Sequence, residues 1–199
     1  MLVDTSVARN FAIADWREEL RSLGGGVIRI AQGVLGVGSE EPGELDGARD
    51  FFERETRRHA AGSPEYTRGL VAVMGLEALI ATRSSHLEVV VPSPPELNTA
   101  IRLQDRDERE WRASLGMKAR RLDAGEAVSV AIAVSRSEAL GCDEEDGQIA
   151  YGAMGGTECR STLDLVKLAV EEGLLPEDEA REGYERLRRE YRFGGLSWQ

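Results

Sequence analysis

Three acidic residues, far apart in the chain, each occur where an ordered element is predicted to begin or end. Asp4 follows a short apolar run, Glu126 opens a helix of small residues, and Asp143 follows a predicted strand at 140–142. In a parallel α/β sheet, the carboxyl ends of strands and the starts of the following helices face one crevice. Three carboxylates there would repel one another unless divalent cations neutralised them. A metal held in this way can activate water and polarise a phosphate.

The segment LGCDEEDGQ (140–148) contains four carboxylates in a row, which on their own are typical of a solvated loop. If the other two acids converge on the same place, a cation explains this concentration of charge. We therefore predict that Asp143 is a metal ligand, supported by one of Glu144, Glu145 or Asp146.

Each of the three acids also has a purely structural interpretation. Asp4, beside Thr5 and Ser6, could be only a turn or a helix cap. Glu126 could only complement the helix dipole, and Asp143 could be a loop acid. The joint pattern favours a site more strongly than any one member does.

The remaining candidate ligands point to oxygen rather than to sulfur or nitrogen. Cys142 and Cys159 are too few for a disulfide framework and lack zinc-ribbon spacing, and both are predicted to be buried small residues. His59 and His86 lie far from either cysteine, which disfavours a zinc site. Oxygen ligands favour hard cations, so the expected cofactor is Mg²⁺ or Mn²⁺.

The net charge of −11 argues against binding of nucleic acid through a broad basic surface. It does not exclude a nuclease, because bound metal would cancel the charge of site carboxylates, and the basic stretches 118–121 and 186–192 could contact phosphates. No apolar run reaches the roughly 18 to 20 residues that span a bilayer. Because the first residues do not resemble a signal peptide, we expect a cytoplasmic protein without membrane contact.

Alternating strand and helix patterns predict an α/β fold. The segment 5–23 has helical periodicity, glycines 24–26 end it, and 27–31 reads as a strand. Further helices are predicted within 46–60, 63–85, 96–116, from Gly125, and within 161–175 and 176–191, with a strand at 89–91. We expect one domain, 1–199, with a mainly parallel central sheet flanked by helices. Residues 36–86 form a predicted helical insertion that adds core and an interface, in preference to a substrate role.

Four segments, in this order, resemble PIN-domain proteins and particularly the bacterial VapC-type toxins. They are MLVDTSV, LDAGEAVSVAIA, CDEEDGQIA and STLDLVKLAVEEGLL, the last with Ser161, Thr162 and Gly173. The matches cover about the first ten residues and most of 122–175, whereas the middle of the chain is much less similar.

The resemblance implies a PIN-like three-layer fold and a metal-dependent endoribonuclease that is the toxin of a toxin–antitoxin pair. The ligands would be Asp4, Glu126 and Asp143, holding Mg²⁺ or Mn²⁺, with a hydroxyl of Ser6 or Thr5 orienting Asp4. It also implies RNA as substrate, an antitoxin protein as partner and a homodimer. The supporting residues are Ser6, Glu144, Asp146 and Thr162.

The chain departs from the family after its second strand, where no acid falls at the usual short distance. Glu40, Glu41 or Glu44 could supply this acid through a longer loop. The departure leaves a second hypothesis open, namely a catalytically weakened PIN-like module that binds or regulates another protein.

Other α/β enzyme classes fit the sequence less well. A phosphatase of the haloacid dehalogenase type needs a second acid where this chain has Ser6. A phosphorelay receiver needs an acidic pair and a late lysine that are not found, and the glycines of 33–38 lack dinucleotide-binding spacing.

Overall fold

The computed structural model describes residues 1–35, 43–82, 85–118, 121–191 and 197–198. The strands of this part of the chain are β1 (Leu2–Val3), β2 (Ile28–Ala31), β3 (Leu87–Val90), β4 (Leu140–Gly141) and β5 (Cys159–Arg160). The helices are α1 (Thr5–Ile13), α2 (Arg17–Leu23), α3 (Gln32–Leu35), α4 (Glu44–Arg57), α5 (Pro64–Ala81), α6 (Pro94–Gln104), α7 (Arg109–Ser114), α8 (Ala124–Ser135), α9 (Glu145–Ala153), α10 (Thr162–Glu171) and α11 (Glu177–Glu190).

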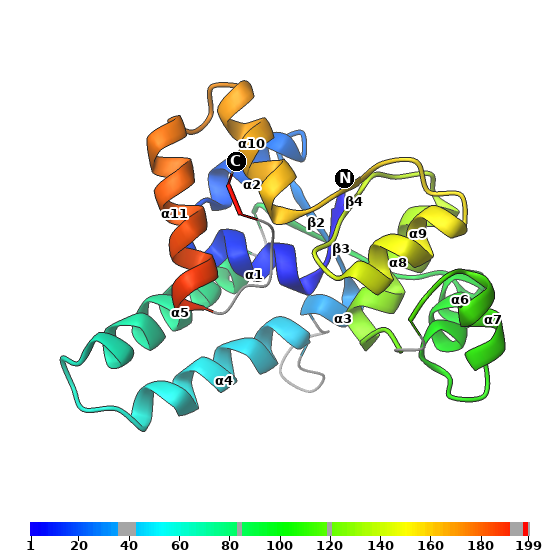
Figure 1. Ribbon diagram of the computed structural model, residues 1–199, viewed down its shortest axis with the longest axis horizontal. Helices are drawn as coiled ribbons and strands as arrows, with labels where there is room; N and C mark the ends of the chain where they lie inside the picture. Colours follow the sequence, from blue (N-terminus) through cyan, green and yellow to red (C-terminus); the bar gives the residue numbers. More distant parts are fainter. Residues whose placement is uncertain (36–42, 83–84, 119–120, 192–196, 199) are drawn as a thin grey trace.

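The strands described form one central sheet in the order β3-β2-β1-β4-β5, and all its pairs are parallel. Helices cover both faces: α8 packs on β1, β2 and β4 with α6 and α9 outside it, whereas α1, α2 and α10 lie on the opposite side (Figure 1). The predicted α/β architecture with a parallel sheet flanked by helices is therefore confirmed. In the part of the chain described here, no helix has the length and hydropathy needed to span a membrane.

The predicted helix over 5–23 is wrong, because the chain forms two helices there. After α1, Asp15 adopts a left-handed conformation with φ of 63°, and the Trp16 N–H donates to the Phe11 carbonyl at 2.9 Å. This pairing ends the helix because it satisfies a carbonyl of the last turn. The Trp16 ring then packs edge-on against Phe11, with 6.1 Å between ring centroids, so the chain turns into α2 over a buried aromatic pair.

The predicted helix over 96–116 is also divided, into α6 and α7. Arg112 of α7 is buried, and its guanidinium donates to the carbonyls of Arg102 and Asp105 at the end of α6. Because the Arg112 side chain binds the last carbonyls of the preceding helix, it favours a turn between the two helices. Two elements were not predicted from the sequence, β5 and α9, and α9 begins within the acidic run 143–146.

The helices of the predicted insertion, α4 and α5, contribute to the core. Leu45 of α4 and Ala72, Leu76 and Leu79 of α5 are fully buried. Helix α5 packs along α4 and on α1. The insertion therefore supplies additional core, as expected, and places α4 beside the helix that follows Asp4.

An ion pair between buried Glu96 and partly exposed Arg136 connects the strand β3 and helix α6 to the end of α8. The Glu96 side chain, 3% exposed, accepts two hydrogen bonds from the Arg136 guanidinium at 2.8 and 2.9 Å and one from the Ser93 N–H at 2.6 Å. Arg136 also donates to the Val91 carbonyl at 3.0 Å. Arg136 and Glu96 thus join three elements, and losing the Glu96 carboxylate would remove the main partner of the arginine.

We expect Glu96→Gln to lower the free energy of unfolding at pH 7 by about 2–3 kcal/mol. The Arg136 hydrogen bonds lower the pKa of Glu96 to about 2, below the roughly 4.3 of an unfolded chain. The stabilisation is therefore complete above about pH 4 and is lost as the pH falls toward 2. Urea denaturation at pH 7, 4 and 3 checks this, with Glu108→Gln, which removes a more exposed pair with Arg102, as the control. Equal losses for both variants would contradict the prediction.

Candidate functional site

Asp4 and Asp143 lie at the point where the strand order of the sheet reverses. From β1 the chain adds β2 and β3 on one side, and β4 and β5 lie on the other. Val3 is paired with Gly141, and the Asp4 N–H donates to the Gly141 carbonyl at 2.9 Å. Ligands of open α/β sheets bind outside the carboxyl ends of the strands at such a reversal. The first and last acids of the sequence analysis therefore occur at the position expected for a binding site.

Asp4 is buried, with 2% of its surface exposed, and it caps α1. Its Oδ1 accepts the Val7 N–H at 2.9 Å. The Ser6 hydroxyl lies 2.8 and 2.9 Å from the two carboxylate oxygens. Of the two hydroxyls considered for orienting Asp4, Ser6 contacts it, whereas Thr5 donates to Glu44. Asp4 therefore caps α1, and the same hydrogen bonds hold its carboxylate at the end of β1.

Asp143 is held mainly by Thr162, the first residue of α10. The Thr162 N–H donates to Oδ1 at 2.7 Å, and its hydroxyl lies 2.6 Å from Oδ2. The Asn10 side chain, 1% exposed, donates to the same Oδ2 at 3.0 Å and also to the Thr162 hydroxyl at 3.2 Å. Thr162 was predicted as a supporting residue from the sequence, whereas Asn10 was not. The only indication of Asn10 in the sequence is that it is a single amide in the apolar stretch of α1.

Glu126 occupies the first turn of α8 with few strong partners. The Asp123 N–H is 3.4 Å from its Oε2, and the Cys142 thiol is 4.0 Å from its Oε1. Gly147 of α9 packs directly against this carboxylate, and a Cβ at Gly147 would overlap Glu126 and Cys142. The close packing of α9 on α8 therefore depends on a glycine at position 147 beside Glu126.

The acids of this site influence one another electrostatically. Burial, followed by repulsion from Asp143, raises the pKa of Asp4 to about 7. Burial, followed by repulsion from Asp4 and Glu144, raises the pKa of Glu126 to about 8. Burial also raises the pKa of Asp143, although the Thr162 hydrogen bonds oppose this shift. Asp4 thus interacts with both of the other predicted ligands, and the site accumulates negative charge as these carboxyls ionise.

Cys142 lies within this carboxylate group. Burial and the carboxylates of Asp4 and Glu126 raise the pKa of its thiol far above the usual range. The thiol therefore stays protonated and behaves as a small buried residue, in agreement with the prediction for this cysteine. Cys159 is only partly buried.

Among the candidates for a further acid, Glu44 lies beside the site. Its carboxylate accepts hydrogen bonds from the Thr5 hydroxyl and from the Gly125 N–H, which are neighbours of Asp4 and Glu126 in the chain. A Cβ at Gly125 would overlap this carboxylate, which explains the glycine of the LDAGEA segment. Glu40 and Glu41 lie outside the described residues.

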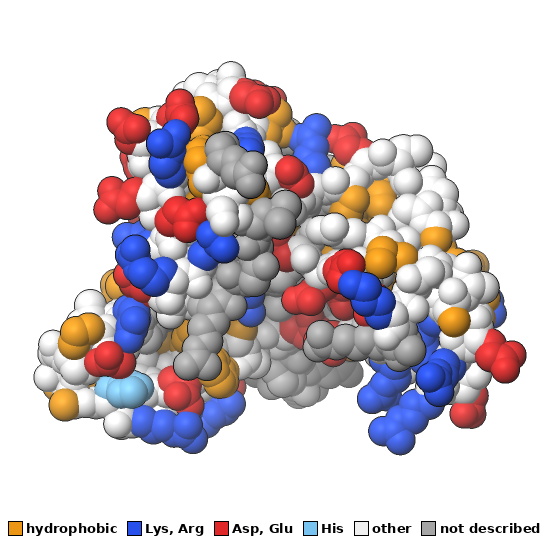
Figure 2. Space-filling view, in the orientation of Figure 1, with side chains coloured by type: hydrophobic (Ala, Val, Ile, Leu, Met, Phe, Trp, Pro, Cys, Tyr) orange, Lys and Arg blue, Asp and Glu red, His pale blue; other side chains and the backbone are white. Residues whose placement is uncertain are grey.

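A cavity of about 340 Å³ opens beside Glu126, between the starts of α8 and α9. Glu144 lines it, but Asp146 accepts the Lys118 N–H at 3.0 Å and Glu145 pairs with the Lys118 ammonium at 2.6 Å. Figure 2 shows acidic and basic side chains together in this region of the surface. Glu144 and Asp146 were both predicted to support Asp143. Glu144 raises the pKa of Glu126 by charge repulsion, whereas Asp146 accepts a hydrogen bond from the Lys118 backbone.

Gly147→Ala is expected to displace the Glu126 side chain, although alanine favours a helix by up to about 1 kcal/mol over glycine. Gly152 lies in the same helix with open space around it, so Gly152→Ala is the matched control and should stabilise the protein slightly. Thermal denaturation should therefore show less stabilisation for Gly147→Ala than for Gly152→Ala. Equal stabilisation by both would show that Gly147 tolerates a methyl group and that Glu126 is not held by this contact.

The donor chemistry of the site fits a hard divalent cation, since the predicted ligands supply carboxylate oxygens only. Asp4 and Glu126 have no arginine or lysine partner within the described residues, so no side-chain cation offsets the charge that they gain when they ionise. In the same part of the chain, however, no group of three or more His, Cys, Asp or Glu side chains is arranged so that it could hold a metal ion. Binding of a metal would therefore require the carboxylates to move closer together.

Comparison with known proteins gives no family assignment. No family model, no curated protein and no solved structure matches this chain. The function therefore has to be inferred from the site itself and from the sequence segments described above.

Proposed function

We propose that this protein is a metal-dependent endoribonuclease of the PIN-domain type that hydrolyses RNA phosphodiesters. The proposal is supported by one observation: Asp4 lies beside Asp143 at the carboxyl ends of β1 and β4 and interacts electrostatically with both Asp143 and Glu126. Buried carboxylates that raise one another's pKa are typical of functional sites.

The ligands in this proposal are Asp4, Glu126 and Asp143. Bound Mg²⁺ or Mn²⁺ would supply an activated water and would polarise the phosphate. Ser6 keeps the Asp4 carboxylate in place, and Thr162 and Asn10 do the same for Asp143. Glu126 has the weakest hydrogen bonds of the three and is therefore the ligand most able to move toward a cation.

The biological setting in this proposal comes from the sequence resemblance. It comprises a role as the toxin of a toxin–antitoxin pair, an antitoxin protein as partner and a homodimer. Light scattering on the purified chain tests the homodimer. Copurification with a coexpressed candidate antitoxin, together with relief of growth arrest, tests the rest.

A second function is favoured by the arrangement of the acids. Because no group of three or more His, Cys, Asp or Glu side chains within the described residues is arranged to hold a metal, a PIN-like module that binds or regulates another protein is the alternative. Such a module would neither cleave RNA nor gain stability from metal.

The deciding experiment measures both properties on the same preparation. Purified protein is incubated with mixed structured and single-stranded RNA in Mg²⁺, Mn²⁺ or EDTA, and its thermal denaturation is followed in the same buffers. The nuclease should cleave only with metal, and metal at a hundredfold its dissociation constant should stabilise the fold by about 2.7 kcal/mol. No cleavage combined with no stabilisation would favour the binding module.

A further inference from the structure

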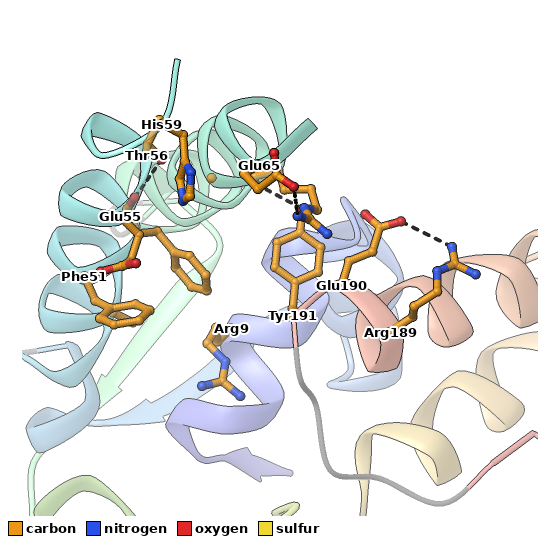
Figure 3. A pocket seen from close by; sticks show the side chains of 13 residues that line it. Arg9, Phe51, Glu55, Thr56, His59, Glu65, Arg189, Glu190 and Tyr191 are labelled. Atoms are coloured by element: carbon orange, nitrogen blue, oxygen red, sulfur yellow. Dashed lines mark hydrogen bonds and ion pairs between the residues drawn. The ribbon is translucent and has the colours of Figure 1, made fainter. Parts of the chain in front are cut away.

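A second and larger cavity is lined by Arg9 of α1, the residue that precedes Asn10. Its volume is about 860 Å³, within the 300–1,000 Å³ range typical of small-molecule sites. Four helices contribute to it, namely α1, α4, α5 and the end of α11. Figure 3 shows Phe51, Glu55 and His59 along one wall, Glu65 and Tyr191 along the other, and Arg9 at the base between them. We refer to this space as the α4–α11 cavity.

Aromatic rings form a row along the α4–α11 cavity. Phe51 packs edge-on against Phe52 with 5.4 Å between ring centroids, and Phe52 packs edge-on against Tyr191 at 6.1 Å. The Tyr191 hydroxyl donates to the Arg68 carbonyl at 3.1 Å, which holds this ring against α5. Phe51 is 51% exposed, so one ring of a fixed row is open to solvent. Exposed rings of this kind bind unpaired nucleic-acid bases by stacking.

Among the described residues that line the cavity, the ion pairs leave one arginine, Arg9, available. Arg68 pairs with Glu65 at 3.2 Å, Arg189 pairs with Glu190 at 3.2 Å, and Glu55 pairs with an arginine outside the cavity. Within the described residues, Arg9 has neither a hydrogen bond nor a carboxylate within ion-pair distance. The uncompensated charge of this cavity is therefore positive and lies at its base, where it would attract an anion such as a phosphate.

Helix α1 connects the cavity with the carboxylate site. It begins at Asp4, and its Asn10 side chain binds Asp143 while the preceding residue, Arg9, lines the cavity. Arg9 also acts electrostatically on Asp143 and opposes the rise in its pKa. A strand of nucleic acid with one phosphate at Arg9 would therefore be adjacent to the carboxylates.

We propose that the α4–α11 cavity holds an unpaired nucleotide of the RNA substrate next to the cleaved bond, with its base stacked on Phe51 and its phosphate paired with Arg9. This inference rests on the proposed nuclease function, and it gives the predicted insertion a substrate role in addition to its place in the core. Single-stranded RNA fits better than a duplex because only an unpaired base can turn out to stack on a protein ring.

Binding is measured first without cleavage, by fluorescence anisotropy of a labelled 12-nucleotide single-stranded RNA of mixed sequence in EDTA. Phe51→Ala and Arg9→Gln are each expected to weaken binding about tenfold. Met74→Ala on α5 and Arg57→Gln on α4, which replace exposed residues outside the cavity, should change the dissociation constant less than twofold. Thermal denaturation confirms that all four variants fold.

The inference is overturned if the wild type does not bind this RNA, or if the cavity variants bind like the controls. It is also overturned if Phe51→Ala weakens binding of a blunt duplex of the same sequence equally, since the stacked base would then not be an unpaired one.

The same variants in Mg²⁺ or Mn²⁺ separate this inference from the proposed function. Cleavage with an unchanged KM in Phe51→Ala and Arg9→Gln would refute the role of the cavity alone. Cavity-dependent RNA binding without any metal-dependent cleavage would refute the nuclease function alone. If both hold, KM should rise about tenfold in the cavity variants while kcat changes little.

Discussion

Asp143→Asn is expected to reduce metal-dependent RNA cleavage by about 1,000-fold or more, because a bound metal contributes several kcal/mol of transition-state stabilisation. The amide keeps the shape of the side chain, and its one oxygen can accept one of the two hydrogen bonds that Thr162 donates to the separate oxygens of Asp143. It removes the negative charge that would bind the cation. Cleavage of RNA in Mg²⁺ or Mn²⁺ measures the loss, and circular dichroism shows that the variant folds.

The matched control for Asp143→Asn is Glu145→Gln, two residues further along the same acidic run. Glu145 is exposed and pairs with Lys118 at the surface, so its replacement should leave cleavage within about twofold. Asp4→Asn and Glu126→Gln should lose activity as Asp143→Asn does. Full activity in all three site variants would show that the site has been assigned to the wrong residues.

Asp4→Asn is expected to stabilise the metal-free protein at pH 8.5 by roughly 2–4 kcal/mol, since a pKa difference of one unit corresponds to about 1.4 kcal/mol. Burial and the Asp143 carboxylate raise the pKa of Asp4 to about 7, above the roughly 3.9 of an unfolded chain. Between these values the folded protein retains a proton that the unfolded chain has lost. The stability of the metal-free wild type should therefore fall as the pH rises from about 4 to 8.

Thermal denaturation in EDTA between pH 4 and 8.5 measures this effect. The gain from Asp4→Asn should vanish near pH 4, where the carboxyl is protonated in the folded protein. Asp15→Asn, which alters an exposed residue, should show no such dependence. Manganese should stabilise the wild type and not the Asp4→Asn variant. A variant that loses stability at pH 8.5 would show that the Asp4 charge is compensated in the absence of metal.

The sequence by itself determined much of the local structure. Apolar runs produced β1, β2 and β3, and the amphipathic patterns of α4, α5, α10 and α11 were recognisable because side-chain periodicity reflects which face is buried. Asp4, Glu126 and Asp143 could be proposed as a group because each occurs at the border of such an element. The strand β5 (Cys159–Arg160) contains no apolar run and was therefore not predicted.

The helix breaks after α1 and α6 depended on contacts between residues that periodicity does not report. Trp16 packs on Phe11, and buried Arg112 returns to the carbonyls that end α6. The segment 5–23 keeps an apolar repeat through its break, so the repeat alone predicts one long helix there. In 96–116 the break falls in the polar run 104–110, which contains no apolar residue that could mark a change of helix.

Only the tertiary structure decided which acids meet. The pairing of β4 with β1, across 138 positions of sequence from Leu2 to Leu140, brings Asp143 beside Asp4. The same fold places Glu44 against Thr5 and Gly125, and it brings Asn10 to Asp143. Strand order is set by which buried faces pack together, and this information is distributed over the whole chain. Local sequence could therefore identify the carboxylates, whereas their mutual electrostatic effects and their hydrogen-bond partners required the packed fold.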